Sequence, residues 1–282
     1  MPQAGSRLSV IIPAFERPAA TIRAVESVLA QDVGLEVLVV DDGSRAPFTF
    51  VHGPPHLKII RLADNMGPAY ARNLGVAEAQ GDWIALLDSD DVWPAGSLKP
   101  RFEAARRDEE NAETTIWTAG FVDVFPNSAA RRVRVPRDSR SLLDFASGCW
   151  TCPGSTALMS REAWSRSGGQ DETLRRLEDY EWLLRWGAGG GRVAAHRGVG
   201  AEITRGGRAR VASIDAAAAR IRALHADQPE AVRRRMESYL LLEAGAARLH
   251  AGAYVGGLAA LARSWTLRPR LRAALEPFWA RA

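Results

Sequence analysis

The N-terminal third of the chain alternates short apolar runs with longer stretches of helical periodicity. Four runs rich in Val, Ile and Leu have the length of strands: Leu8–Ile12, Leu35–Val40, Lys58–Leu62 and Trp83–Leu87. Two of the stretches between them have the 3.6-residue period of helices, Thr21–Gln31 and Pro68–Ala79. This alternation predicts the α/β fold class, with a mostly parallel sheet flanked by helices.

The middle of the chain has weaker patterns. Residues 108–147 predict two strands, Thr115–Val124 and Arg131–Val135. Residues 154–185 predict a strand that leads into a helix and then, after a Gly-rich turn, into the segment Leu174–Trp186. These elements extend the α/β domain beyond its N-terminal third.

Helical patterns dominate the C-terminal part, which is rich in Ala and Arg and has breaks near Pro229 and Pro269. We therefore divide the chain into an α/β domain, residues 1–212, and a basic helical extension, residues 213–282. Within the extension, Glu237–Arg268 has the periodicity of a helix–turn–helix unit resembling one tetratricopeptide repeat. A single hairpin is too small to stand alone, so we expect it to pack against the main domain or a partner.

The end of the fourth predicted strand carries the densest group of acidic residues. Asp88, Asp90 and Asp91 follow Leu87 within four positions. Such crowding of like charges is costly unless a cation neutralises it, and a divalent metal with oxygen ligands does so. A metal at this point could clamp a diphosphate. The competing interpretation is an acidic turn or helix cap, since isolated Asp-x-Asp tripeptides are common.

A second acidic pair, Asp41 and Asp42, follows the second predicted strand and precedes Gly43. Because ligands of open α/β sheets bind at the carboxyl ends of strands, the two acidic groups are expected to share one site. Asp42 could accept hydrogen bonds from a ribose or a base, and Gly43 permits close approach of the backbone. Arg72, on the helix after the third strand, could face the nucleotide or pair with an acidic neighbour.

Taken together, five segments closely resemble the family 2 nucleotide-sugar glycosyltransferases of GT-A fold. They are Leu8–Gln31 with its motif Pro13–Pro18, Val39–Ser44, Asn65–Gly75, Gly81–Ile84 and Leu87–Asp91. A fainter likeness covers Pro153–Trp186, where Gly168-Gly169-x-Asp171-Glu172 is followed by Glu178-Asp179. The resemblance implies an α/β domain of GT-A type that transfers a sugar from a nucleoside-diphosphate sugar to an acceptor hydroxyl with inversion. It favours UDP as the donor nucleotide, with GDP and dTDP open.

The resemblance also implies roles on the donor side. Pro13, Asp42 and Arg72 would hold the base, and Asp88 would hold the ribose or the metal. Asp90 would bind the metal, Mn²⁺ or Mg²⁺, that bridges the donor diphosphate. We therefore expect a metal-dependent enzyme.

On the acceptor side, the resemblance implies Asp179 as the general base. Inversion requires attack from the face opposite the leaving diphosphate, so a carboxylate beside the acceptor must remove the hydroxyl proton. Glu178 and Asp179 supply carboxylates from a distant part of the chain, although an acid on the surface of a helix would look the same.

The chain departs from the family in one segment. Many members carry a His shortly after the base, near the diphosphate and the metal, whereas Glu202–Arg208 has none. Arg205 and Arg208 are the cations that could neutralise the leaving diphosphate instead. His196 lies outside the expected position. The third protein ligand of the metal therefore stays open.

Other classes of protein are less consistent with the sequence. A nucleotidyltransferase would need a Gly-rich phosphate loop after the first strand, and a dinucleotide-binding oxidoreductase would need Gly-x-Gly-x-x-Gly. A nucleotide- or carbohydrate-binding protein could keep the fold without catalysis, but the joint presence of Asp88, Asp90 and Asp179 argues against it. We expect a role in polysaccharide or glycoconjugate biosynthesis, with a glycan, lipid-linked or protein acceptor.

Charge is distributed unevenly along the 282 residues. Residues 1–204 carry a net charge of −4 and residues 205–282 one of +8. The basic region has no nucleic-acid-binding motif and no interleaved aromatic residues, so no nucleic-acid partner is expected. An anionic membrane surface or a lipid-phosphate acceptor would match it, and so would a solvated basic face.

Two cysteines, Cys149 and Cys152, are spaced like a redox pair or half of a zinc site. No second Cys or His pair completes four-coordination, so we expect structural thiols. No apolar run reaches the roughly 20 residues that span a bilayer. The first apolar run ends at Pro13 without a cleavage site, so we expect a cytoplasmic protein, with possible contact at the inner face of the membrane.

Overall fold

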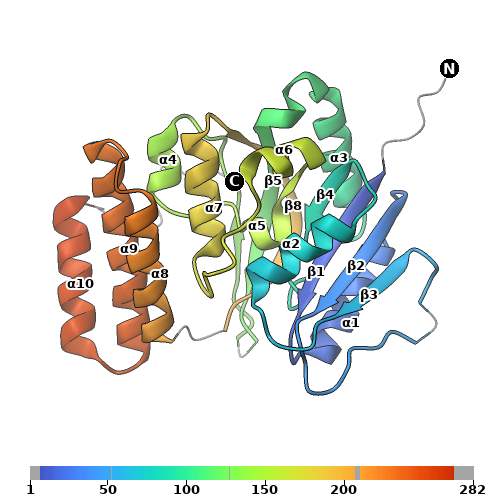
Figure 1. Cartoon of the computed structure of the whole chain (residues 1–282), viewed down its shortest axis with the longest axis horizontal. Coiled ribbons are helices and arrows are strands. Elements are labelled where there is room, and N and C mark those ends of the chain that lie inside the picture. Colours follow the sequence, from blue (N-terminus) through green and yellow to red (C-terminus); the bar gives the residue numbers. More distant parts are fainter. Residues whose placement is uncertain (1–6, 52, 127, 207–209, 270–282) are drawn as a thin grey trace.

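The structure, a computed structural model, describes residues 7–51, 53–126, 128–206 and 210–269. One eight-stranded sheet runs through it in the order β3-β2-β1-β4-β7-β5-β6, with β8 paired to β5 (Figure 1). The strands are β1 Leu8–Ala14, β2 Leu35–Asp41, β3 Leu57–Arg61, β4 Trp83–Leu86, β5 Thr115–Val124, β6 Arg131–Arg134, β7 Leu158–Ser160 and β8 Arg192–Thr204. Every strand predicted from the sequence is present, and β8 is an additional one.

The first four strands of the sheet are parallel. β1 pairs with β2 and β4, and β2 pairs with β3, whereas β7 joins β4 and β5 in antiparallel fashion. Every residue of β1 is buried, as expected for a parallel strand with helices on both faces. The carboxyl ends of β1, β2 and β4 therefore meet at one edge of the sheet.

Helices cover both faces of this sheet. They are α1 Pro18–Leu29, α2 Pro68–Glu78, α3 Leu98–Arg107, α4 Leu142–Ala146, α5 Pro153–Thr156, α6 Arg161–Ser167, α7 Glu178–Ala188, α8 Val211–Leu224, α9 Glu230–His250 and α10 Tyr254–Leu267, with a 3₁₀-helix at Glu109–Thr114. Alternate residues of β1 face opposite layers: Val10 and Ile12 pack with α1 and α3, and Ile11 packs with α2, α6 and α7. α1 begins three residues before its predicted start because proline suits the first turn of a helix.

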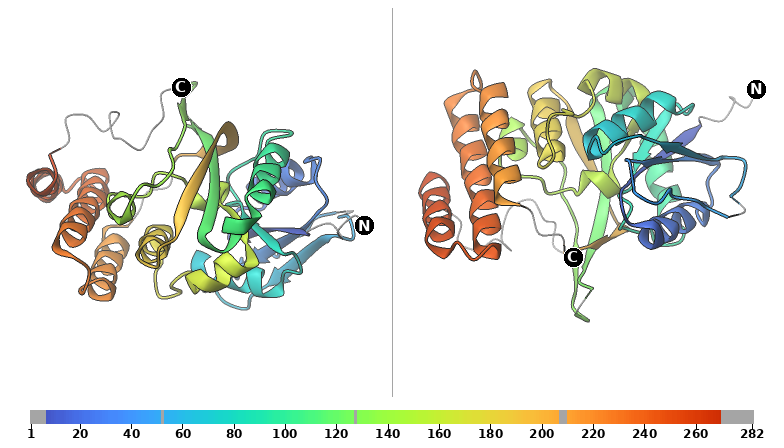
Figure 2. Two further views of the ribbon diagram at one scale, coloured as in Figure 1. Left: turned by 90° about the horizontal axis from the view of Figure 1, so that it is seen from above. Right: turned by 60° about the horizontal axis from the view of Figure 1, so that its bottom comes forward.

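The C-terminal helices stack beside the α/β domain, with α10 outermost (Figures 1 and 2). Their ends agree with the predicted breaks, since α9 begins after Pro229 and α10 ends before Pro269. α9 and α10 form the predicted helical hairpin, which turns at Gly252. The two helices approach closely at Gly245. A Cβ atom added to this glycine would lie only 3.1 Å from the carbonyl oxygen of Gly257.

The apolar core crosses the predicted boundary at residue 212. α8 begins at Val211, and its Ile221 lies in one buried cluster with Ile11 of β1, Trp182 of α7 and Met236 of α9. The helical extension is therefore packed on the main domain. Within the described residues, no helix has the length and apolar content to cross a membrane.

Candidate active site

The two acidic residues at the end of β2 hold the loops that follow. Asp41 is fully buried and accepts a hydrogen bond from the backbone N–H of Ser44 at 3.2 Å. Asp42 is 3% exposed and accepts from the backbone N–H groups of Met66 at 2.7 Å and Gly67 at 2.8 Å. Burial raises the pKa of Asp42, and these backbone donors offset part of that rise. Asp42 therefore anchors the loop ahead of α2.

Arg72 joins two distant segments of the chain. α2 places its guanidinium in the interior, with 4% of the residue exposed. Nη2 donates to Oδ1 of Asp88 at 2.6 Å, and Nη1 donates to Oε1 of Glu178 at 3.0 Å and to Oε1 of Gln170 at 2.9 Å. Burial alone would lower the pKa of Arg72, but the charges of Asp88 and Glu178 raise it above its ordinary value. One cation thus connects the end of β4 with the start of α7.

Asp88 and Asp90 are the accessible members of the acidic group after β4. Their side chains are 35% and 31% exposed, so a ligand can reach them. Asp90 also forms an ion pair with Arg17, which lies just before α1. Burial raises the pKa of Asp90, Arg17 opposes that rise and the charge of Asp88 adds to it.

Asp91 differs from these two neighbours because it is buried. Its carboxylate accepts hydrogen bonds from the hydroxyl of Ser155, in α5, and from the backbone N–H of Thr204, at the end of β8. Burial raises the pKa of Asp91, and the charge of Asp88 adds to the rise. Asp91 thus ties α5 and β8 to the segment after β4, behind the accessible carboxylates.

The donor set at the end of β4 suits a divalent cation in its chemistry. Hard cations prefer carboxylate oxygens, which Asp88 and Asp90 supply. Arg72 and Arg17 already pair with these two carboxylates, so a metal would share them with the arginines. In the part of the chain that the structure describes, no three Asp, Glu, His or Cys side chains gather closely enough to hold a metal ion. Asp88 and Asp90 are therefore the candidate protein ligands for such a cation.

Asp179, the carboxylate predicted as the base, lies in the first turn of α7 and is partly buried. Its Oδ1 accepts from the backbone N–H of Tyr180 at 2.7 Å, and its Oδ2 lies 3.5 Å from the thiol of Cys149, which donates to it. Burial raises the pKa of Asp179 to about 6, and the adjacent Glu178 adds to the rise. Asp179 is thus mainly ionised at neutral pH and is a stronger base than an ordinary carboxylate.

Helix α9 brings two residues to this side of the site that no sequence pattern indicated. The ring centroid of Tyr239 lies 4.5 Å from that of Tyr180, and Glu243 follows one helical turn later. Burial raises the pKa of Tyr239, and the negative charge of Glu243 raises it further. Cys149 and Asp179 make smaller contributions in the same direction. No local motif marks Tyr239 and Glu243, because only the packing of α9 brings them near Asp179.

The other predicted residues occupy separate positions around this centre. Pro13 is buried near the end of β1. Arg205 forms an ion pair with Asp123 at 2.7 Å and leaves 42% of its side chain exposed. Arg208 lies outside the described residues, and His196 lies within β8. The roles predicted for Pro13 and Arg205 toward a substrate stay predictions.

The two cysteines are free thiols. Burial raises the pKa of both, that of Cys152 to about 12, so the thiols are neutral at physiological pH. Cys149 donates to Asp179, and Cys152 precedes α5. These surroundings suit the structural role expected for them.

Among the described residues, three other than glycine have left-handed backbone conformations, with φ of 53° at Glu16, 51° at Cys152 and 60° at Leu177. Each lies in a segment that borders the site. Glu16 follows β1, Cys152 immediately precedes α5 and Leu177 immediately precedes α7. Residues with a side chain rarely adopt this conformation, and such residues concentrate at functional sites.

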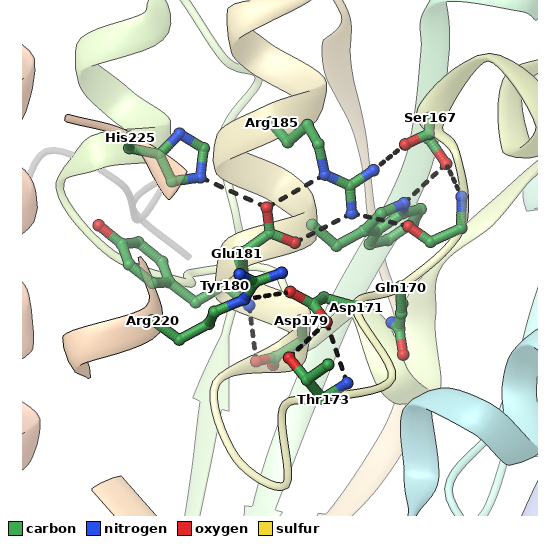
Figure 3. A network of polar contacts seen from close by, with 12 residues as sticks. Ser167, Gln170, Asp171, Thr173, Asp179, Tyr180, Glu181, Arg185, Arg220 and His225 are labelled. Atoms are coloured by element: carbon green, nitrogen blue, oxygen red, sulfur yellow. Dashed lines mark hydrogen bonds and ion pairs between the residues drawn. The ribbon is translucent and has the colours of Figure 1, made fainter. Parts of the chain in front are cut away.

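A network of polar contacts holds α7 against α8 (Figure 3). Glu181, 1% exposed, accepts from Arg185 at 2.9 Å and lies 3.4 Å from Nε2 of His225 in the turn after α8. Burial alone would raise the pKa of Glu181, but the contacts with His225 and Arg185 lower it. Asp171, ahead of α7, pairs with Arg220 of α8 at 3.1 Å. The position of α7 therefore depends on α8.

Sequence comparison finds a family and several curated relatives. The family model described as Glycosyl transferase family 2 matches residues 9–167. Succinoglycan biosynthesis protein ExoO of Rhizobium meliloti is 40% identical over 102 residues, which are 35% of this chain and 29% of that protein. Succinoglycan biosynthesis protein ExoU of the same organism is 29% identical over 217 residues, which are 70% of this chain and 62% of that protein. The chain thus spans less than two thirds of the length of either relative.

Structural comparison confirms the fold. The crystal structure of S. aureus TarS 1-349 is similar with a TM-score of 0.64, covering 93% of this chain and 81% of that chain at 19% sequence identity. The same TarS fragment has been crystallised in complex with UDP and with UDP-GlcNAc. The similarity supports the predicted α/β sheet of GT-A type with its flanking helices.

Proposed function

Since the chain belongs to glycosyl transferase family 2, we propose that it moves a sugar from a nucleoside-diphosphate sugar to an acceptor hydroxyl with inversion. One observation carries this proposal. Arg72 pairs with Asp88 at the end of β4 and with Glu178 at the start of α7. Carboxylates suited to a donor diphosphate therefore adjoin Asp179, which is suited to activate an acceptor.

The donor diphosphate is assigned to the accessible end of β4. Asp88 and Asp90 would hold a divalent cation, which when bound would neutralise charge on the diphosphate and favour its departure. The ion pair between Arg17 and Asp90 is partly exposed, so the Arg17 guanidinium can turn toward a phosphate oxygen. UDP is the favoured nucleotide because the structurally similar TarS binds UDP and UDP-GlcNAc.

The acceptor hydroxyl is assigned to the side of Asp179. As a carboxylate with raised pKa, Asp179 would remove the hydroxyl proton as the new bond forms on the face opposite the diphosphate. Tyr239 and Glu243 border the same side from α9. The succinoglycan biosynthesis relatives favour an acceptor in polysaccharide or glycoconjugate assembly.

Thermal denaturation with nucleoside diphosphates tests the donor assignment. UDP together with Mn²⁺ should raise the melting temperature more than either alone, because ligands of the native state stabilise it by mass action. Asp90→Ala should lose the metal-dependent part of the increase. Asp32→Ala removes a carboxylate that is 85% exposed on another surface, so it should respond like the parent. Equal responses of Asp90→Ala and the parent to Mn²⁺ would contradict the assignment.

Turnover separates a transferase from a protein that only binds nucleotides or carbohydrates. Release of the nucleoside diphosphate from UDP-, GDP- and dTDP-sugars in the absence of acceptor should be measurable with at least one donor. Nuclear magnetic resonance of the sugar product should show the anomeric configuration opposite to that of the donor. Binding without any release would favour the non-catalytic alternative, and retained configuration would exclude inversion.

A further inference from the structure

Helix α10 exposes an apolar stripe. The exposed fractions are 66% for Tyr254, 86% for Val255, 61% for Leu258 and 55% for Trp265. In helical projection these four residues lie within about one third of the circumference, at 100° per residue. Arg263 is the one charged residue among the 14 of α10. A solvated helix ordinarily carries more charge than this, so the stripe is a candidate contact surface.

The opposite side of α10 is occupied by α9. Gly257 and Ser264 are buried there, and the Oγ of Ser264 donates to the carbonyl of Ser238. The backbones of the two helices lie close together at Gly245, where an added Cβ atom would lie only 2.8 Å from the side chain of Leu261. α10 is therefore held firmly with its apolar stripe away from α9, and it forms the outer layer of the molecule (Figure 2).

The C-terminal part of the sequence, which contains the stripe, is cationic. After Glu243 the chain contains six arginines and one acidic residue, Glu276. The segment from Gly252 to Pro269, which includes α10, has no acidic residue. An apolar surface in a segment of net positive charge is complementary to an anionic lipid surface, where side chains such as those of Tyr254 and Trp265 lie at the level of the headgroups.

We propose that the exposed stripe of α10 docks on an anionic lipid bilayer, with the helix lying along the surface. A helix of this length is about 21 Å long, at 1.5 Å per residue, which is too short to span the hydrocarbon core. A second copy of the chain is a less suitable occupant, because residues 252–269 contain two arginines and no acidic residue, so two such segments would bring like charges together. The inference does not depend on the identity of the donor or the acceptor.

Sedimentation of the full-length protein with lipid vesicles tests this docking. The parent should bind vesicles of phosphatidylcholine and phosphatidylglycerol, and much less of it should bind vesicles of phosphatidylcholine alone. The double variant Val255→Asp and Leu258→Asp should bind the anionic vesicles at least about tenfold more weakly, because it removes two apolar side chains from the contact. Added salt should weaken binding by the parent, because screening reduces the attraction between arginines and lipid phosphates.

A matched control uses two exposed valines in other elements. Val51→Asp together with Val133→Asp introduces the same charge at residues that are 76% and 54% exposed. This variant should bind anionic vesicles nearly as the parent does. Unchanged melting temperatures would show that both double variants remain folded.

Three results would overturn the inference. The first is that the parent does not bind anionic vesicles. The second is that the α10 variant binds them as well as the parent does. The third is that the control variant loses as much binding as the α10 variant. Light scattering adds a further discrimination. A dimeric parent and a monomeric α10 variant would assign the stripe to a second copy of the chain instead.

Discussion

The buried guanidinium of Arg72 is the residue on which the proposed site depends most. Its loss would leave the buried Glu178 and the partly exposed Asp88 close together without their shared cation. Arg72→Met should therefore destabilise the protein by about 3 kcal/mol, the usual consequence of removing one partner from a buried ion pair. Thermal denaturation would measure the change, and UDP-dependent stabilisation should fall as well. Arg23→Met, at an exposed position on α1, is the control and should have little effect on either quantity.

Asp179 gives a second prediction at the same scale. Asp179→Asn should reduce sugar transfer by about 10²- to 10⁴-fold, as for loss of a positioned base, while UDP binding stays near that of the parent. Parent activity should increase with pH and reach half of its maximum near pH 6, where Asp179 ionises. Normal transfer by the variant would move the assignment to Glu178, Asp171 or Glu172. Loss of UDP binding would instead make Asp179 a structural residue.

The stability of Asp179→Asn should change in the opposite direction from its activity. The folded state holds the Asp179 proton more tightly than the unfolded chain, because burial raises the pKa from 3.8 to about 6. Ionisation therefore reduces the stability of the parent as the pH increases through this interval. Asparagine does not ionise, so the variant should have the higher melting temperature at pH 7 and lose that advantage at pH 4.

Among the elements, α7 is positioned by its contacts with α8. Glu181→Gln should lower the melting temperature at neutral pH, because the contacts of Glu181 with His225 and Arg185 stabilise its charged form in the folded state. The pKa of this group is lowered by folding, so its contribution is present above the ordinary pKa of 4.5 and is lost as the pH falls through the lower folded value. Parent and variant should therefore converge under acidic conditions.

Glu103→Gln provides the control for Glu181. Glu103 pairs with Arg107 one turn away on α3, but the side chains are 48% and 77% exposed. Such surface pairs contribute little to stability because water and salt screen them. If Glu103→Gln changed the melting temperature as much as Glu181→Gln does, burial of the Glu181 contacts would not explain their contribution to stability.

The sequence predicted regular elements better than irregular ones. Strands such as β1 and β2 consist mainly of apolar residues, as burial on both faces requires. β8 was not predicted because it is only partly buried and contains Gly198 and Gly200, which interrupt a strand pattern.

Among the candidate site residues, local motifs indicated Asp88, Asp90 and Asp179. Tyr239 could not be found in the same way, since its approach to the site follows from the packing of α9.

At the scale of the whole molecule, the helical extension completes the core. Ile221, Met236 and Leu240 lie in the same buried cluster as the sheet. A chain that ends at residue 212 would expose the other side of this cluster, so it should aggregate or melt well below the parent when examined by circular dichroism and size-exclusion chromatography. A fragment of residues 1–212 that remains monomeric and melts with the parent would contradict this prediction.

The left-handed backbones of Glu16, Cys152 and Leu177 have a consequence for attempts to make the protein more heat-resistant. Each conformation opposes folding by about 1 kcal/mol or more, and glycine would remove that opposition. A selection for thermal tolerance alone should therefore favour substitutions such as Glu16→Gly, at an exposed residue. The same substitutions would let the loops around the site sample more conformations and should slow turnover, so tolerance and catalytic rate would diverge in the selected variants.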